Sequence, residues 1–254
     1  MLVVKPAEAL FKAYLHYCAL AATKPDPALR ETLTAPYPDS QLEIVLNNHS
    51  LNERSFTPIC LALRDLSTSL PLTRIDLGQN PYLRDSARPL FSILPKTPLL
   101  RTLLLDRTGL SDTAALHLFD LLPHTRLTEL SIAHNALSPA CFERIASKLA
   151  SASSPCPLSV LDVSNNKIGD RVGITLLSAI LGHTRISKLG LSKTNLGYKL
   201  GVWMLRMLRE SGPFALRSLL LNYNSGISVQ QKQQIACLLE EQELESMGNL
   251  GDCE

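Results

Sequence analysis

The frame L-x-x-L-x-L-x-x-N-x-L recurs along this chain, and it constrains the fold more than any other feature. The copies LTELSIAHNAL and LSVLDVSNNKI share apolar residues at frame positions 1, 4, 6 and 11, an Asn at position 9, and little else. A motif in which only the positions expected to be buried are constrained indicates a structural unit repeated in space. The copies start at Gln41 (a weaker match), Leu72, Leu100, Leu127, Leu158, Ile186 and Leu216.

Each copy changes its hydrophobic period halfway. Its first part alternates, as at Leu161 and Val163, which predicts a strand, and its second part repeats every four residues, as at Cys141, Ile145 and Leu149, which predicts a helix. Stacking buries both elements, with the strands in one parallel sheet and the helices in an outer layer. Because a helix is wider than the strand spacing of about 4.8 Å, we predict a curved, right-handed α/β solenoid, a horseshoe with parallel strands on the concave face and helices on the convex face.

Frame position 9 lies where the chain is expected to turn away from the strand. A buried amide there can donate and accept, and so pair with the backbone groups that the turn leaves inside. Thr can do part of the same work, and His49 in the weak first copy predicts an irregularity. The occupants are His49, Asn80, Thr108, Asn135, Asn166, Thr194 and Asn224.

Seven copies in register, with a full helix in each unit, resemble the leucine-rich-repeat proteins of the ribonuclease-inhibitor-like class over roughly residues 40–240. The resemblance implies a non-enzymatic scaffold that binds a partner protein. The N-terminal stretch PAEALFKAYLHYCALAATKPDPALRETL reads as two short helices broken at Lys24-Pro25-Asp26-Pro27. It resembles the start of some centrosomal and ciliary leucine-rich-repeat proteins, although this chain lacks their coiled coil. We expect a cytoplasmic location, and that likeness adds the centrosome, cilium or cytoskeleton as specific options.

The pattern predicts three segments. Residues 1–38 are expected to form an α-helical N-terminal cap, because an end repeat alone would expose apolar surface. Residues 39–245 are expected to form a leucine-rich-repeat domain of about seven repeats. Residues 246–254 are expected to form a short acidic tail, since six acids and no base follow Lys232.

Composition and charge narrow the class of partner. Apolar residues make up 45% of the chain, which supports a sizeable core, and the formal charge of +2 gives no electrostatic case for nucleic acid or an anionic membrane. No stretch approaches the 18 uninterrupted apolar residues of a membrane span. We therefore expect a monomer with protein partners and without nucleic-acid or membrane binding.

The cysteines indicate a reducing compartment. They are far apart, without a C-x-x-C pair, so neither a zinc site nor a thioredoxin-type motif is predicted. Four lie in predicted helices, where buried free thiols are expected. The six are Cys18, Cys60, Cys141, Cys156, Cys237 and Cys253.

Signatures of catalysis and metal binding are lacking. The sequence has no G-x-x-x-x-G-K-[ST], G-x-G-x-x-G, H-E-x-x-H or G-x-S-x-G, and no two histidines are spaced like metal ligands. We predict no enzymatic activity, no catalytic residue, no metal and no cofactor.

The strand face is the predicted binding site. Positions 4 and 6 point inward, so 3, 5 and 7 point outward and 8 lies near the rim. A nucleic-acid groove would be basic with interleaved aromatic residues, whereas these columns balance acids and bases around a few apolar anchors, which suits a protein. The predicted protein-binding residues are Arg74, Asp76, Leu104, Asp106, Arg107, Glu129, Ser131, His134, Val160, Asp162, Lys188, Lys193, Leu220 and Tyr223.

Other surfaces and one other function stay open. The loops after position 9, the convex helices and the end caps could each bind instead. The GTPase-activating protein for Ran shares this repeat class, and it implies a second function, regulation of a small GTPase or of another enzyme through polar loop residues. Arg84, Asp85 and Arg107 are the candidates for that role.

Overall fold

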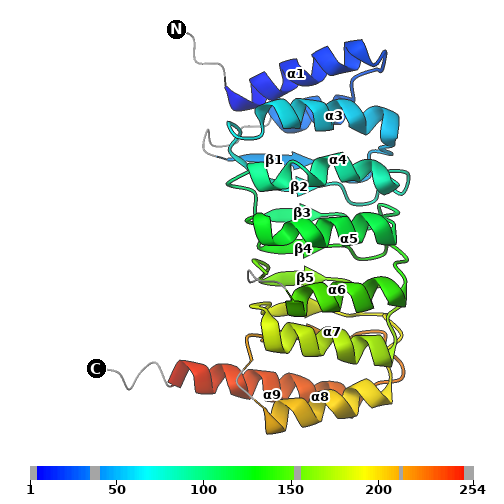
Figure 1. Ribbon diagram of the computed structural model, residues 1–254, viewed down its shortest axis with the longest axis vertical. Coiled ribbons are helices and arrows are strands. Elements are labelled where there is room, and N and C mark those ends of the chain that lie inside the picture. Colours follow the sequence, from blue (N-terminus) through cyan, green and yellow to red (C-terminus); the bar gives the residue numbers. More distant parts are fainter. Residues whose placement is uncertain (1–4, 35–40, 152–155, 212–213, 249–254) are drawn as a thin grey trace. The chain divides into compact units, whose positions relative to one another are not determined.

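The computed structural model describes residues 5–34, 41–151, 156–211 and 214–248 (Figure 1). The chain forms two compact units, unit 1 at Met1–Asn135 and unit 2 at Ala136–Glu254. In each unit, strands alternate with helical segments along the chain, as the repeat predicts.

Unit 1 contains four strands. They pair in parallel and in chain order, and the labelled helices of the unit lie on one side of them (Figure 1). The elements are α1 (Pro6–Leu20), α2 (Pro27–Thr34), β1 (Leu42–Val45), α3 (Glu53–Leu66), β2 (Leu72–Asp76), η1 (Arg84–Ala87), α4 (Arg88–Phe91), η2 (Leu94–Lys96), β3 (Thr102–Leu104), α5 (Asp112–Leu121), η3 (Leu122–His124) and β4 (Glu129–Ser131).

Unit 2 repeats the same plan with three strands, again parallel and in chain order. Helix α6 packs against α7, and α8 packs against both α7 and α9. The elements are α6 (Pro139–Ser151), β5 (Val160–Asp162), α7 (Asp170–His183), β6 (Lys188–Gly190), α8 (Tyr198–Glu210), β7 (Ser218–Leu220) and α9 (Val229–Gly248).

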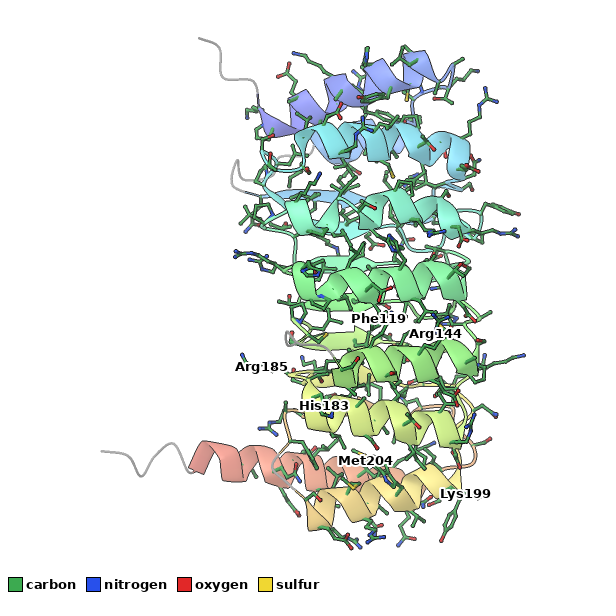
Figure 2. All side chains as sticks on the ribbon, in the orientation of Figure 1. Phe119, Arg144, His183, Arg185, Lys199 and Met204 are labelled. Atoms are coloured by element: carbon green, nitrogen blue, oxygen red, sulfur yellow. The ribbon has the colours of Figure 1, made fainter. Side chains whose placement is uncertain are left out.

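The strand register confirms the frame. Position 3 of one strand pairs with position 3 of the next, as in Arg74 with Thr102 and Lys188 with Ser218. Apolar side chains of the frame fill the core, together with helix residues such as Phe119 of α5 in unit 1 and Met204 of α8 in unit 2 (Figure 2). Each unit is therefore an α/β solenoid with a leucine-rich-repeat-like plan.

Asn80 shows how frame position 9 holds successive repeats together. Its side-chain oxygen accepts hydrogen bonds from the backbone nitrogens of His49 (3.1 Å) and Leu51 (2.9 Å) in the preceding repeat. Its amide nitrogen donates to the carbonyls of Leu46 (2.8 Å) and Leu77 (2.7 Å). The predicted role of the buried amide is thus confirmed.

Threonine does part of the same work. The hydroxyl of Thr108 donates to the Leu105 carbonyl at 2.8 Å, like an Asn amide. It is too short to reach back, and the preceding repeat instead donates from the Arg84 nitrogen to the Thr108 main-chain carbonyl at 2.9 Å. His49 is exposed, unlike the other six occupants of position 9, which confirms the irregularity expected in the first copy.

Frame position 8 has a feature that the sequence reasoning missed. All seven residues there have φ between 53° and 62°, a left-handed conformation that costs a non-glycine residue about 1–2 kcal/mol. Where another strand of the same unit follows, the conformation directs the amide at that strand. The Gln79 nitrogen donates to the Asp106 carbonyl at 2.7 Å, and the Lys193 nitrogen to the Asn222 carbonyl at 2.8 Å. These hydrogen bonds offset the backbone strain.

Most of the described cysteines behave as expected. Cys18, Cys60 and Cys141 are free, buried and helical, and Cys156 is also free and buried. Burial disfavours the charged thiolate and raises the pKa of Cys60 to about 12. The expectation of burial is wrong for Cys237, which lies on α9 but is exposed.

The two ends of the chain match the prediction in part. Helices α1 and α2 are the two expected helices, interrupted before Pro27. Helix α9 continues to Gly248, past the predicted start of the acidic tail at residue 246. The rest of the predicted tail, with Cys253, and residues 1–4 and 35–38 of the predicted cap lie outside the described residues.

Candidate functional site

The candidate site is the open strand face, defined in each unit as the outward side chains of frame positions 3, 5, 7 and 8. The pairing of strands places these side chains in rows that run across the sheet of each unit. In unit 1, Arg74 lies beside Thr102 and Thr102 beside Glu129. In unit 2, Val160 lies beside Lys188. The predicted residues of each unit are therefore brought together on one face.

The charged residues of this face in unit 1 bind one another. The Arg74 guanidinium forms an ion pair with the Asp76 carboxylate at 3.2 Å. The Ser131 hydroxyl donates a hydrogen bond to Asp106, and Glu129 accepts one from the hydroxyl of its neighbour on β3 at 3.1 Å. A partner that used these groups would have to displace bonds that already exist.

Two predicted binding residues in unit 1 are buried, so the expectation that their side chains are exposed is wrong. Asp76 and Ser131 are each 7% exposed. The Asp76 carboxylate is directed forward along the chain and accepts a hydrogen bond from the Gly78 nitrogen at 3.0 Å. Asp76 at position 5 thus bonds the backbone of position 7 in its own repeat, and Ser131 bonds Asp106 at position 7 of the preceding repeat, which simple strand alternation does not anticipate.

The other predicted residues of unit 1 are accessible to different degrees. Leu104, Asp106 and Glu129 are half-buried, whereas Arg107 and His134 are exposed at the ends of their strands. The last two hold the left-handed conformation of position 8, which projects their side chains outward.

The loop residues proposed for enzyme regulation also lie in unit 1. Arg84 is exposed and has φ of 46°. A Cβ atom at Gly109 would meet the Arg84 side chain at 3.2 Å, so Arg84 packs over the loop that follows Arg107. The Asp85 carboxylate accepts a hydrogen bond from the Ser111 hydroxyl at 2.5 Å, which ties it to the start of α5.

The lysines of unit 2 contrast with the charges of unit 1. Lys188 and Lys193 are both exposed, and no described carboxylate forms an ion pair with either. Asp162 accepts a hydrogen bond from the Ser164 nitrogen at 2.9 Å and lies over Gly190. A Cβ atom on that glycine would stand 2.2 Å from the Asp162 carboxylate, so a larger residue at position 190 would force that carboxylate to move.

Apolar side chains flank these lysines. Leu220 is 51% exposed and Tyr223 is 83% exposed, while Val160 is half-buried. Tyr223 and Lys193 also line an open cavity of about 340 Å³ that lies over the loops after β6 and β7. The face of unit 2 therefore offers cations, large apolar groups and a hollow within one surface.

The part of unit 2 that precedes residue 240 carries a charge surplus that the whole-chain value hides. Between residues 136 and 239 there are twelve lysine and arginine residues against four aspartate and glutamate residues. Unit 1 has thirteen of each. The six acids that follow Lys232 bring the total back to +2. Counting charge by repeat, and not over the chain, would have revealed this from the sequence.

None of the helices in the described parts of the chain combines the length and the apolar character needed to cross a membrane. Within the same residues, no group of three or more His, Cys, Asp or Glu side chains could hold a metal ion.

Comparisons with known proteins give structural neighbours only. Neither a family model nor a curated protein sequence matches the chain. Similar solved structures include the tropomodulin C-terminal domain of Caenorhabditis elegans, at 16% identity and a TM-score of 0.47, covering 76% of this chain and 96% of that chain. Leiomodin-1 actin-binding site 2 matches at 12% identity and a TM-score of 0.45, covering 76% of this chain and 92% of that one.

A chain from the Rad7 and Elc1 complex in yeast matches at 17% identity and a TM-score of 0.49. It covers 90% of this chain, which spans 58% of that one. At these levels of similarity none of the three assigns a family or a function. The leucine-rich-repeat-like fold follows from the strand register and the hydrogen bonds of frame position 9 described above.

Proposed function

We propose that this protein is a non-enzymatic scaffold that binds a partner protein through the open strand face, with the face of unit 2 making the main contact. One observation carries the proposal. The apolar side chains of Leu220 and Tyr223 are exposed on the same face as two lysines, Lys188 and Lys193, that lack an ion-pair partner among the described residues. An apolar centre with aromatic anchors and a polar rim is the usual composition of a protein interface.

The chemistry of unit 2 also selects the kind of partner. Lysines without ion pairs attract carboxylates, and complementary charge speeds association and fixes orientation. Asp162 is already bonded to the Ser164 nitrogen, and its carboxylate lies over Gly190. Its negative charge disfavours a carboxylate of the partner at that point. The favoured partner surface is acidic at its edges and apolar at its centre.

The finer assignments belong to the same proposal. Helices of 13, 14 and 13 residues in α6, α7 and α8 support the ribonuclease-inhibitor-like class of repeat. Buried free thiols favour a reducing, cytoplasmic compartment, where the centrosome, cilium or cytoskeleton are the proposed locations. The scaffold is proposed to act as a monomer, without cofactor, nucleic acid or membrane.

Paired charge-reversal variants test the site. The first is Lys188→Glu with Lys193→Glu on the strand face. The control is Lys199→Glu with Arg209→Glu on α8, which makes the same change in net charge on exposed helix residues (Figure 2 labels Lys199). Both variants should keep the wild-type circular dichroism spectrum, because all four side chains are exposed.

Each protein is then used for affinity capture from lysate of the parent organism, before and after nuclease treatment. A partner retained by wild type and by the α8 control, but bound at least about tenfold more weakly by the strand-face variant, supports the proposal. Equal retention by both variants would contradict the site. Loss of all captured protein after nuclease treatment would contradict direct protein binding.

A second function, regulation of a small GTPase, is favoured by one observation in unit 1. Arg84 and Arg107 are both exposed, on adjacent loops. An arginine that reaches a nucleotide accelerates hydrolysis by about 10³–10⁵-fold. Measuring GTP hydrolysis by a panel of small GTPases, with wild type and with Arg84→Ala and Arg107→Ala, tests this function. Equal rates with and without the protein would remove it.

A further inference from the structure

The outer edge of β7 carries backbone amides that are equivalent to hydrogen-bond donors of the other strands. Within a unit, every strand that is followed by another strand donates hydrogen bonds to it from these amides. Between neighbouring strands, the amides of frame positions 6 and 8 donate to the carbonyls of positions 5 and 7 on the next strand. From β6 to β7, the Leu191 nitrogen donates to the Leu220 carbonyl at 2.9 Å and the Lys193 nitrogen to the Asn222 carbonyl at 2.8 Å. The same pair of bonds is made by Leu46 and Asn48, Leu77 and Gln79, Leu105 and Arg107, and Val163 and Asn165.

The equivalent donors after β7 are the amides of Leu221 and Tyr223. No residue in the described part of the chain accepts a hydrogen bond from either. Tyr223 nevertheless has φ of 58°, within the narrow range of the other position 8 residues. Its amide therefore keeps the direction that in the other repeats serves the next strand.

Apolar surface is left uncovered along the same edge. Leu219, at frame position 4, is half-buried, and Leu220 is 51% exposed. The other six residues at position 4 are no more than 1% exposed. They are Ile44, Ile75, Leu103, Leu130, Leu161 and Leu189.

We propose that the β7 edge binds an extended segment of a partner protein as an additional parallel strand. Main-chain carbonyls at two alternate residues of the segment accept from the amides of Leu221 and Tyr223, as β7 itself accepts from β6. Adding a strand to an open sheet edge is a general mode of peptide recognition. Apolar side chains between those carbonyls cover Leu219, so the segment is apolar at alternate positions and contains no proline at the paired residues.

A second copy of this chain fits the edge poorly. Head-to-tail pairing would need the free edge of β1, and helix α2 lies there, with the Thr32 hydroxyl donating to the Val45 carbonyl at 3.0 Å. Two-fold pairing would place β7 antiparallel to itself. An antiparallel ladder needs regular extended backbone on both strands, and the left-handed Tyr223 interrupts it.

This edge adjoins the open strand face and shares Leu220 and Tyr223 with it, but a partner would recognise the two surfaces through different groups. The edge is recognised through main-chain amides, whereas the face is recognised through Lys188, Lys193 and the exposed apolar side chains. The two proposals can therefore fail independently, and the charge-reversal variants of the face leave the edge amides in place.

Amide hydrogen exchange followed by nuclear magnetic resonance tests the proposal on the full chain. The probe is a synthetic peptide of residues 158–168, LSVLDVSNNKI, which carries the repeating strand frame, and the control is a scrambled peptide. In the free protein, the Leu221 and Tyr223 amides should exchange about 100-fold or more faster than those of Leu191 and Lys193. Saturation with the probe should slow both edge amides by about tenfold or more.

Two variants locate the effect. Leu219→Lys introduces a charged side chain that must extend into water across the β7 edge. It should therefore abolish the slowing of amide exchange by the probe. Val202→Lys, on the exposed surface of α8, should retain it. Equal slowing by the scrambled peptide, slow exchange of the edge amides in the free protein, or no slowing by the probe would overturn the proposal. Slowing that grows with protein concentration alone, together with a dimer mass in light scattering, would overturn it in favour of a second copy.

Discussion

The first and last strands of this protein have opposite surroundings. In unit 1, α2 packs beside β1, the Thr32 hydroxyl bonds the Val45 carbonyl, and Ile44 is fully buried. In unit 2, Leu219 of β7 is half-buried and Leu220 is exposed. An open strand edge invites pairing with other chains, and covering it with a helix is one of the ways in which proteins prevent this.

Helix α9 closes a different part of unit 2. Its buried residues Ile235 and Leu239 lie on one face of the helix, and the Gln242 amide donates to the Leu208 carbonyl of α8 at 3.0 Å. It thus continues the helix layer, whereas the strand edge beside it stays accessible. The comparison teaches that a repeat protein can close its helix layer with a terminal helix and still leave one strand edge available for binding.

The largest difference between the two edges should come from a charge at frame position 4. Ile44→Lys buries an ammonium group without a partner and should lower the free energy of unfolding by about 4–5 kcal/mol or more. Leu219→Lys can reach water at the open edge and should cost about 1 kcal/mol. Urea unfolding followed by circular dichroism measures both.

The single tryptophan, Trp203 of α8, gives a separate fluorescence signal from unit 2. It should report little change in the unfolding of Leu219→Lys. Equal losses of stability for the two lysine variants would show that the β7 edge is as well covered as the β1 edge in solution.

The next comparison is made at frame position 9, between the second repeat and the first. Asn80→Ala removes the acceptor for the amides of His49 and Leu51 and the donor to two buried carbonyls, and it should cost about 3 kcal/mol. His49→Ala changes the occupant of the same frame position in the first repeat. Because His49 is exposed, its replacement should stay within about 0.5 kcal/mol. Urea unfolding of both variants checks this, and a small loss for Asn80→Ala would contradict the role of position 9.

The repeat predicts the strands, their register and the Asn of position 9, because each depends on residues within one frame. It predicts the exposed residues of the strand face less well. Asp76 and Ser131 are polar and fall at outward positions, yet they are buried by hydrogen bonds to the backbone and to a neighbouring strand. Such bonds depend on distances between side chains that a period of two does not specify.

Two features of unit 2 could not be seen from the frame alone. The left-handed backbone at position 8 occurs with Asn, Gln, Arg, His, Lys and Tyr, so no residue type signals it. The accessible edge of β7 depends on what packs against Leu219, and the sequence of that strand resembles the others. The charge surplus of residues 136–239, by contrast, was available from the sequence once the repeats had been counted separately.

The stability of the N-terminal helices is predicted to depend on the buried hydroxyl of Tyr14. The Asp26 nitrogen donates to the Tyr14 hydroxyl at 2.7 Å, and this bond ties the turn after α1 to the helix. Tyr14→Phe leaves the Asp26 amide without this acceptor and should cost about 1–2 kcal/mol at pH 7 in urea unfolding. Tyr17→Phe removes a hydroxyl that donates to Asp65 at the surface, and it should not change stability measurably.

The pH dependence separates this bond from a simple loss of packing. Burial raises the pKa of Tyr14 above its usual value of 10.0, so the unfolded chain releases the proton first. The stability contributed by neutral Tyr14 is complete below pH 10 and is lost as the pH rises above 10. The free energies of unfolding of wild type and Tyr14→Phe should therefore converge as the pH rises above 10. Parallel curves would contradict burial of the hydroxyl.

The smallest predicted effect tests whether the edge of β7 is preformed. A glycine at frame position 8 avoids the left-handed cost of about 1–2 kcal/mol but loses about 0.5–1 kcal/mol through the more flexible unfolded chain. Gln79→Gly and Tyr223→Gly should each gain about 0.5 kcal/mol in urea unfolding, whereas Gln79→Val and Tyr223→Val should each lose about 1 kcal/mol.

Positions 79 and 223 differ in whether a following strand accepts a hydrogen bond from the amide. The Gln79 amide is held by the Asp106 carbonyl of the next strand, and the Tyr223 amide has no such acceptor among the described residues. If glycine stabilises both positions equally, Tyr223 holds the left-handed conformation without a following strand, and the edge can receive a parallel segment without rearranging. If glycine helps at Gln79 and not at Tyr223, the conformation at Tyr223 requires the bond that a partner would supply, and binding must then order the edge at the expense of affinity.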